Sequence, residues 1–135
     1  MSAAHDLQVA MVAALKADAE LVALLGGAER ILDRVPPELE FPFVAIGRTS
    51  VQDRSTDDRS GEEHLVTMRC WSRVKSRSEV LALAERVTTA LSSLEGSFGD
   101  TRVVSFRMMS NEHGYEPLDR AWRAVLRFRA LTEPV

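Results

Sequence analysis

A chain of 135 residues, 45% hydrophobic and 27% charged, is long enough to bury one hydrophobic core without covalent staples. Its longest apolar run is far shorter than the roughly 20 residues that cross a bilayer, so no membrane-spanning helix is expected. The N-terminal segment has no basic leader, and Asp6, Lys16 and Asp18 interrupt its apolar residues, which is unlike a secretory signal. The single cysteine, Cys70, cannot form an internal disulfide, which suits a reducing compartment.

The net charge of −3 is distributed unevenly along the chain. Residues 1–68 contain six Lys or Arg and twelve Asp or Glu, whereas residues 69–135 contain eleven and eight. This asymmetry is typical of a nucleic-acid surface, or of a protein whose acidic part contacts the basic part of another copy, a head-to-tail contact that can close a ring. It also arises by chance on a solvated surface. Charge alone leaves these three interpretations open.

The first predicted element is helical. Apolar residues recur at three- and four-residue spacing from Leu7 to Leu15 and continue to Leu25. Gly26-Gly27 then predicts the helix end. Asp18 is a good N-cap residue, and the apolar residues after it leave the earlier stripe, so a break into two helices is predicted there.

Two strands and a charged segment are predicted next. Residues 30–35 form a short strand that ends at Pro36-Pro37, because proline cannot donate a ladder hydrogen bond. Residues 41–49 form the second strand. Residues 52–64 contain five carboxylates, two arginines and no apolar side chain, so we expect a long charged loop over residues 50–64.

Residues 64–72 alternate as a third strand, with Val66, Met68 and Cys70 on one face. The clearest helix follows: Ser76 and Glu79 have the S-x-x-E spacing of a capping box, and Gly96 is expected to end the helix. The apolar stripe of this helix is predicted to be buried; it consists of Val80, Leu83, Ala84, Val87, Leu91 and Leu94.

Two last strands are predicted over residues 102–109 and 121–131, with a polar connecting loop that holds Asn111, His113, Gly114 and Pro117. In the first of these strands, one face is expected to carry Val104, Phe106 and Met108. In the last strand, one face is expected to carry Trp122, Ala124, Leu126, Phe128 and Ala130.

The predicted order is therefore helix, strand, strand, strand, helix, strand, strand. This order predicts an α+β fold, a small antiparallel sheet of four to five strands with two amphipathic helices packed on one face. No internal repeat or linker is present, so residues 1–135 are expected to form a single domain.

No group of residues has the spacing that catalysis or metal binding requires. The three histidines lie far apart in sequence, and one cysteine cannot build a structural zinc site. The nearest approach to a hard-cation site is a cluster that lacks the register of a calcium loop: Asp57, Asp58, Glu62, Glu63 and His64. Neither a G-x-S-x-G turn nor a phosphate-binding loop is present. We expect no enzyme, no cofactor and no metal.

The best candidate binding surface is an arginine-rich sheet face formed by Arg107, Arg123, Arg127 and Arg129. Basic residues on a sheet can follow phosphates, but single-strand binders add stacking aromatic residues on the same face. Here the aromatic residues of the last strand are expected on the opposite face. A solvated face, or an interface with acidic residues of a second copy, remains open beside nucleic-acid binding.

Three stretches of the sequence resemble a known family. They are residues 14–47 (with DRVPP and FPFVAIG), residues 61–87 (with GEEH, WSR and SRSEVLALAE) and residues 125–133 (VLRFRALTE). In order and spacing they resemble the tail-completion, or tail-terminator, proteins of long-tailed bacteriophages and alphaproteobacterial gene transfer agents. The family has no catalytic signature to carry over.

The resemblance implies a structural protein that forms a hexameric ring, caps the tail tube, stops its polymerisation and contacts the head-side connector. DNA would pass through the ring without specific binding. The protein would be made in the bacterial cytoplasm and incorporated at the head–tail joint, with no membrane partner. By analogy, the 50–64 loop would be an arm that reaches a neighbouring subunit or the tube. A dimeric α+β module that binds a small molecule or nucleic acid is the alternative.

Ring contacts beyond a dimer join two different surfaces, and an acidic loop with a basic sheet face supplies such a pair. One hypothesis pairs these carboxylates with arginines of the adjacent subunit, such as Arg123, Arg127 or Arg129; the carboxylates are Asp57, Asp58, Glu62 and Glu63. A second hypothesis places the loop carboxylates on the lumen, where they would repel DNA. The residues expected at a subunit or partner interface are Asp53, Arg54, Asp57, Asp58, Arg59, Glu62, Glu63, Arg107, Arg123, Arg127 and Arg129.

Overall fold

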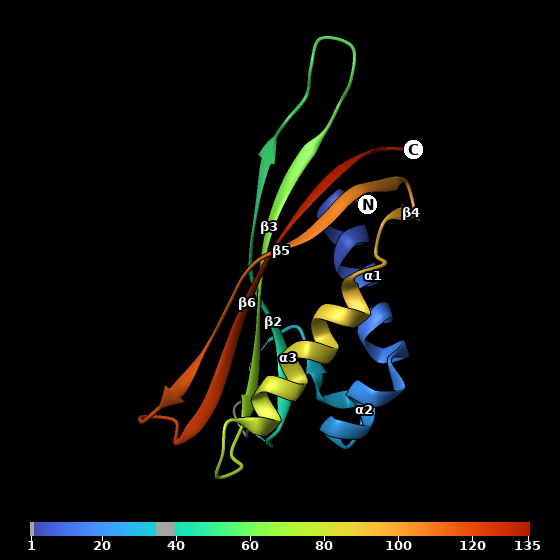
Figure 1. Ribbon diagram of the computed structural model, residues 1–135. Helices are drawn as coiled ribbons and strands as arrows, with labels where there is room; N and C mark the ends of the chain where they lie inside the picture. Colours follow the sequence, from blue (N-terminus) through green and yellow to red (C-terminus); the bar gives the residue numbers. More distant parts are fainter. Residues whose placement is uncertain (1, 35–39) are drawn as a thin grey trace.

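The computed structural model describes residues 2–34 and 40–135, which form three α-helices and six strands (Figure 1). The elements in chain order are α1 (Ala3–Ala17), α2 (Ala19–Leu25), a short 3-10 turn (Ala28–Arg30), β1 (Ile31–Leu32), β2 (Phe43–Asp53), β3 (Glu62–Ser72), α3 (Ser78–Leu91), β4 (Gly96–Phe98), β5 (Thr101–Glu116) and β6 (Ala121–Pro134). The α+β class is as predicted. The predicted end of the first strand at Val35 and Pro36-Pro37 lies outside the described residues.

The strands form one mixed sheet in the order β1-β2-β3-β6-β5-β4. β1 pairs with β2 in parallel, and the other neighbours pair antiparallel. The prediction of a purely antiparallel sheet of four to five strands is therefore wrong in strand number and in the sense of one pair. The edge strand β1 lies within the strand predicted over residues 30–35, whereas the other edge strand, β4, is three residues long and too short to leave an alternation in the sequence.

The helices lie on one face of the sheet and leave the other face open, as predicted (Figure 1). The break at Asp18 is confirmed: its Oδ1 accepts a hydrogen bond from the Leu21 N–H at 2.9 Å and begins α2. α2 ends at Gly26, which has φ 83°, a left-handed conformation that glycine adopts without a Cβ clash.

The predicted capping box of the later helix is wrong. α3 begins at Ser78, and Arg77 at its N-cap makes no side-chain capping bond. Glu79 instead accepts a hydrogen bond from the Ser72 hydroxyl at 2.7 Å, which ties the helix start to the end of β3. α3 also ends before Gly96, at Leu91, and Gly96 begins β4.

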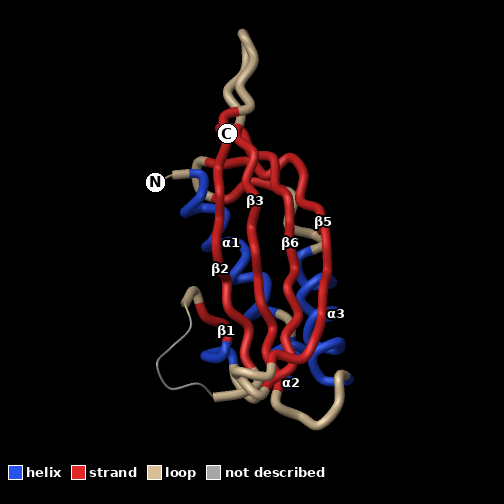
Figure 2. Tube along the Cα trace, turned by 90° about the vertical axis from the view of Figure 1, so that its left-hand side faces the viewer, coloured by secondary structure: helices blue, strands red, loops and turns tan. Residues whose placement is uncertain are grey.

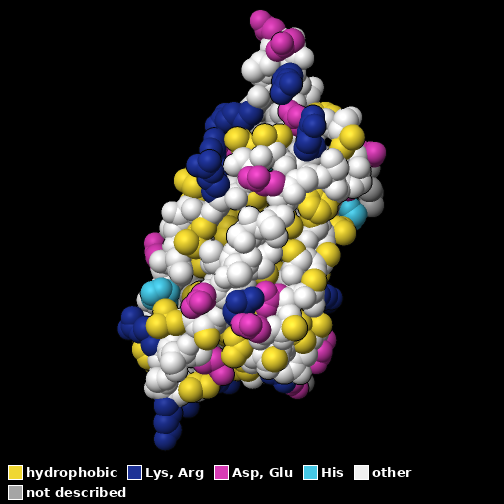
Figure 3. Space-filling view, turned by 45° about the vertical axis from the view of Figure 1, so that its right-hand side comes forward, with side chains coloured by type: hydrophobic (Ala, Val, Ile, Leu, Met, Phe, Trp, Pro, Cys, Tyr) yellow, Lys and Arg dark blue, Asp and Glu magenta, His cyan; other side chains and the backbone are white. Residues whose placement is uncertain are grey.

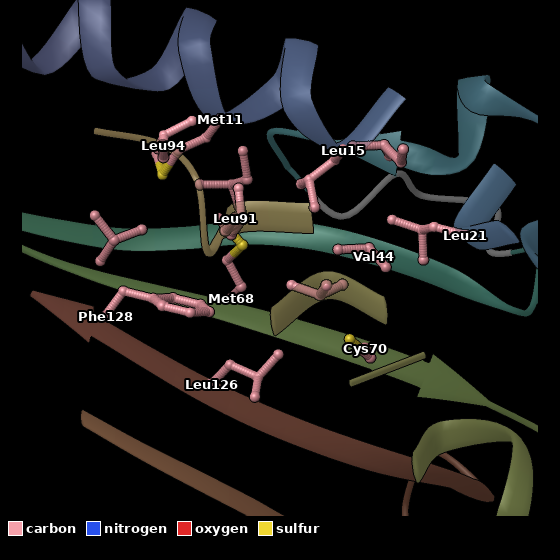
Figure 4. Packing of buried hydrophobic residues seen from close by; sticks show 14 of the residues in the cluster. Met11, Leu15, Leu21, Val44, Met68, Cys70, Leu91, Leu94, Leu126 and Phe128 are labelled. Carbon is pink, nitrogen blue, oxygen red and sulfur yellow. The ribbon is translucent and has the colours of Figure 1, made fainter. Parts of the chain in front are cut away.

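The hydrophobic core lies between the helices and the covered sheet face (Figure 4). All members of the predicted α3 stripe are buried, as is the predicted inward set of β6 from Ala124 to Ala130. Phe128 stacks on Phe106 with ring centroids 5.2 Å apart. Cys70 is buried in this core as predicted, and burial raises the pKa of its thiol to about 12, so it is a packing residue rather than a nucleophile.

Two predicted loops are partly strand. β5 continues through the segment that holds Asn111, His113 and Gly114, and only the turn from Pro117 follows it. β5 also contains register shifts between Val103 and Ser105 and between Met108 and Ser110. Because a bulge shifts the alternation by one residue, Val104 is exposed while Val103 and Phe106 are both buried, against the predicted face of this strand.

The charged loop predicted over residues 50–64 is likewise shorter than expected. β2 and β3 continue as a paired hairpin as far as Asp53 and Glu62, so the connection comprises only residues 54–61. This hairpin projects beyond the rest of the sheet (Figure 2). We call residues 50–64 the arm.

Candidate subunit interface

The end of the arm is an ordered turn. The Arg54 N–H donates to the Gly61 carbonyl at 2.8 Å, and the Thr56 N–H donates to the Arg59 carbonyl at 2.7 Å. Asp57 and Asp58 lie between Thr56 and Arg59, at the tip. All residues from 50 to 60 are exposed. Figure 3 shows acidic side chains at the end of the arm and Lys or Arg side chains just below them. The arm is therefore a preformed projection whose tip is acidic.

Short-range hydrogen bonds of Asp53, Ser55 and Thr56 stiffen this turn. The Ser55 N–H donates to Asp53 Oδ1 at 2.8 Å, and the Gly61 N–H donates to Ser55 Oγ at 3.1 Å. The Ser55 hydrogen bonds hold the pKa of the Asp53 carboxyl below its ordinary value. Thr56 Oγ1 donates to Asp58 Oδ1 at 3.0 Å. These short-range bonds keep Asp53 charged and give the turn one shape.

At the base of the arm, Glu63 is held by two arginines on the open face of the sheet. Its carboxylate accepts from Arg129 Nε at 2.5 Å and from an Arg54 amino group at 3.3 Å. The Arg129 hydrogen bond lowers the pKa of Glu63. Glu63 is one of the few buried charged residues, and its two partners cover it. Two residues predicted to pair between subunits thus pair with each other within the chain.

The strand register brings the predicted arginines together on the open face. In the pairing of β3, β6 and β5, Arg127 and Arg129 lie beside one another with Arg107 directly opposite Arg129. Arg123 lies farther along the same face, with its guanidinium 5.6 Å from the Trp71 ring centroid. Arg69 joins this surface opposite Val125 and was missed in the sequence, since only the register shows it. We call these five residues the arginine face.

Carboxylates that the sequence prediction missed partly neutralise this face. Arg123 pairs with Glu116 at 2.8 Å, and Arg127 is 3.7 Å from Glu112. Both glutamates belong to the stretch that was predicted as loop, which is why their pairing was not foreseen. For Arg69 and Arg107, no ion pair lies within the described part of the chain. The arginine face keeps unpaired charge near Arg107.

A second ion-pair group links the arm to the end of β6. Glu133 is 3.5 Å from Arg59 and 2.5 Å from Arg102. Arg59 is therefore directed back toward the body of the protein and not away from it with Asp57 and Asp58. The predicted interface residues consequently divide into an acidic tip, a base of internal ion pairs and the arginine face.

The carboxylate cluster that was nearest to a cation site does not assemble. His64 is completely buried on the covered side of the sheet, where its Nε2 lies 2.9 Å from Thr132 Oγ1. Burial lowers the pKa of His64. Glu63 lies on the opposite face, and Asp57 and Asp58 lie at the tip of the arm. Within residues 2–34 and 40–135, no three His, Cys, Asp or Glu side chains could hold a metal ion together.

None of the helices that the structure describes is long and apolar enough to cross a membrane.

Comparison with known proteins gives a consistent result. Residues 9–133 match the family described as "Tail completion protein gp17". A search of curated proteins finds no significant match. Among solved structures, the fold is similar to a chain of the "Virion of native gene transfer agent (GTA) particle", with a TM-score of 0.84 and 27% identity over 98% of both chains. The match to the family model covers nearly the whole chain, and the chain therefore belongs to the tail completion family, structural proteins of phage tails and of related gene transfer agents.

Proposed function

We propose that this protein forms a ring of six copies that caps the tail tube, ends its polymerisation and joins the tail to the head-side connector. The observation that carries the proposal is the similarity over 98% of both chains to a component of a gene transfer agent virion. The whole chain, arm included, is thus comparable to a subunit of such a particle. The number six comes from the resemblance described above.

The surfaces of the chain support a ring rather than a two-fold dimer. A cyclic contact joins two different surfaces of each subunit, whereas a two-fold dimer joins a surface to itself. The acidic tip at Asp57 and Asp58 and the arginine face are different and complementary in charge. The tip projects beyond the sheet, so its carboxylates are available to a neighbour.

The ion pairs within the chain narrow the proposed contact. Glu63 is occupied by Arg129 and Arg54, so the tip carboxylates Asp57 and Asp58 are the candidates to meet a neighbour's arginine face. Exposed pairs of this kind contribute about 0.2–1 kcal/mol each, so they set register and orientation more than affinity. Placement of the tip on the lumen, where it would repel DNA, is the competing arrangement.

DNA would pass through the ring without specific binding. Trp71 lies on the same side of the sheet as the arginine face, between the Arg123 guanidinium, 5.6 Å from its ring centroid, and the buried Phe43 ring, whose centroid is 6.2 Å away. It therefore offers no free ring on which a base could stack. This arrangement also argues against the alternative of a nucleic-acid-binding module. In this proposal the protein is made in the bacterial cytoplasm, is built into the particle at the head–tail joint and carries out no catalysis.

The test is electron microscopy of particles from a producing strain that lacks this chain. The proposal expects overlong tails, or heads and tails that remain separate, and rescue when the chain is supplied again. Normal, joined particles from the deletion strain would refute the proposed function.

A further inference from the structure

The sheet has a long unpaired edge on each side. β1 pairs only with Val44 and Ala45, so residues 47–53 of β2 have no outer strand partner among residues 2–34 and 40–135. On the other side, β4 pairs only with residues 101–103, which leaves residues 104–116 of β5 without an outer partner in the described chain. Figure 2 shows β2 and β5 as the long outer strands. Such edges present backbone N–H and C=O groups that can pair with another chain.

The backbone groups that point outward from β2 follow from one hydrogen bond. The Arg54 N–H donates to the Gly61 carbonyl, so the backbone N–H and C=O groups of Arg54 point toward β3. Alternate residues of a strand point their backbone groups to opposite sides. Thr49, Val51 and Asp53 therefore direct their N–H groups to the free edge. Val51 is 41% exposed.

The backbone groups that point outward from β5 likewise follow from one hydrogen bond. The Val135 N–H donates to the Asp100 carbonyl at 3.0 Å, so the odd-numbered residues of β6 point their backbone groups toward β5. Beyond the second bulge, the partners of those residues on β5 are even-numbered, from Ser110 to Glu116. Asn111, His113 and Tyr115 therefore direct their N–H groups to the free edge.

The two edges run in compatible directions. Three successive antiparallel pairings separate β2 from β5, so the two strands run in opposite senses. A second copy placed beside the first in the same orientation therefore brings its β2 antiparallel to β5. Pairing of β2 with β2, or of β5 with β5, would instead give a two-fold contact that cannot continue around a ring.

We propose that β2 of one copy pairs antiparallel with β5 of the next, so that the sheets of successive subunits become continuous. This inference rests on the proposed ring and specifies its contact. The free part of β2 is the end that enters the arm. The free part of β5 includes its C-terminal end, before the turn that leads into β6, and this end lies at the opposite end of the sheet from the arm. Neighbours must therefore be staggered along the strands, which tilts the strands to the ring axis, as in closed barrels.

The charges along the two edges agree with this direction of pairing. Antiparallel pairing of β2 with β5 of the neighbour brings Arg48, at the start of the free stretch of β2, beside the C-terminal end of β5, which carries Glu112 and Glu116. For Arg48 no ion pair lies within the described part of the chain, and Glu112 has a 72% exposed side chain. The arm then continues along the neighbour toward Arg107, which, like Arg69, has no ion pair within the described part of the chain. Edge pairing thus carries the acidic tip to the least neutralised part of the arginine face.

Proline substitution tests the pairing, with alanine as the matched control. Val51→Pro and His113→Pro each remove one outward N–H and no ladder bond within the chain, whereas Val51→Ala and His113→Ala keep the N–H. Each variant is supplied to the producing strain that lacks the chain, and the thermal unfolding of each purified chain is measured. We expect both alanine variants to restore joined particles, and both proline variants to lose them while retaining a cooperative unfolding transition. Joined particles at the wild-type number with a folded Val51→Pro chain would overturn the inference.

Disulfide cross-linking tests the pairing of β2 with β5 independently, which is needed if a proline variant fails to fold. The native Cys70 is buried and unreactive, so the only reactive thiols of a chain carrying Val51→Cys and His113→Cys are the two introduced at the edges. To sample neighbouring registers between copies, each cysteine on β2 (Thr49→Cys or Val51→Cys) is combined with each cysteine on β5 (Asn111→Cys or His113→Cys). Oxidised particles are expected to give a ladder of covalent oligomers with at least one combination, and only monomer with each single-cysteine variant. Monomer alone from every combination would overturn the inference.

These results separate two kinds of failure. Normal particles from the strain that lacks the chain would refute the proposed function itself. Loss of joined particles in that strain, together with their full rescue by a folded Val51→Pro chain, would refute only the strand pairing.

Discussion

Reversing the charge of the arm tip should weaken contact between copies without weakening the fold. In the variant with Asp57→Lys and Asp58→Lys, both substituted side chains are exposed at the tip. Among the residues that the structure describes, the only side-chain hydrogen bond lost is the one from Thr56 Oγ1 to Asp58, at an exposed position. Surface changes of this kind alter the free energy of unfolding by no more than about 0.5 kcal/mol. Stability should therefore stay close to that of the wild type.

The expected loss in association can be worked out from the same two positions. Exposed ion pairs contribute about 0.2–1 kcal/mol each, so removal of two pairs costs about 0.4–2 kcal/mol per interface. That range corresponds to a factor of about 2 to 30 in the dissociation constant. Since salt screens exposed charges with a Debye length of about 10 Å at 0.1 M, the wild-type affinity should fall with salt more steeply than that of the variant.

The assay is sedimentation velocity of the purified chain over a range of protein and salt concentrations, with urea unfolding of each variant. Glu85→Lys with Glu95→Lys is the matched control, because it changes the net charge equally at exposed positions away from the arm. If the tip variant and the control have the same dissociation constant and the same salt dependence, the contact between the tip and the arginine face is refuted.

Three further predictions concern stability. Phe128→Ala should lower the free energy of unfolding by about 3–5 kcal/mol, since Phe128 is buried against the Phe106 ring; urea denaturation measures this, and a loss below 1 kcal/mol, roughly that of a surface change, would contradict the packing. Asp18→Ala should cost at least about 0.5–2 kcal/mol, the range for loss of the α2 cap, because it also breaks the ion pair with Arg86 at 2.7 Å; Asp18→Asn, which retains a capping oxygen, should cost less in the same assay. His64 has a pKa below its ordinary value of 6.5 because it is buried, so the unfolded chain binds a proton more readily than the folded one. The contribution of His64 to the free energy of unfolding should then be constant above pH 6.5 and should fall between pH 6.5 and the pKa of the folded state, by up to about 1.4 kcal/mol per pH unit. Denaturation at several pH values should show this decline in the wild type and not in His64→Gln. An equal decline in the wild type and in His64→Gln would exclude His64 as its source.

The sequence predicted those elements that have one buried and one solvated face. The stripe of α3 and the alternation of β6 arise because one side of each packs in the core, and both were placed correctly. The arm was predicted as loop because residues 50–60 are all exposed, so no apolar alternation marks its strands. β1 lies within the strand predicted over residues 30–35, whereas β4 was missed because three residues are too short to show an alternation.

The candidate interface was predicted only in its composition. The residue types and the two opposite charges were identified, but the ion pairs within the chain were not. Glu63 meets Arg129, and Arg59 meets Glu133, only because the β3–β6 register brings residues more than sixty positions apart into contact. The bulges of β5 likewise decide which side chains face the core, and no local signal in the sequence marked them.

The most direct test of the account is a reconstruction of the head–tail joint from purified particles by electron cryo-microscopy. The account predicts a closed ring of copies of this chain between the tail tube and the connector. It also predicts that β2 of each copy lies along β5 of the next, with the acidic tip of each arm on the neighbour's arginine face. A ring absent from the joint, or copies of this chain located elsewhere in the particle, would contradict it.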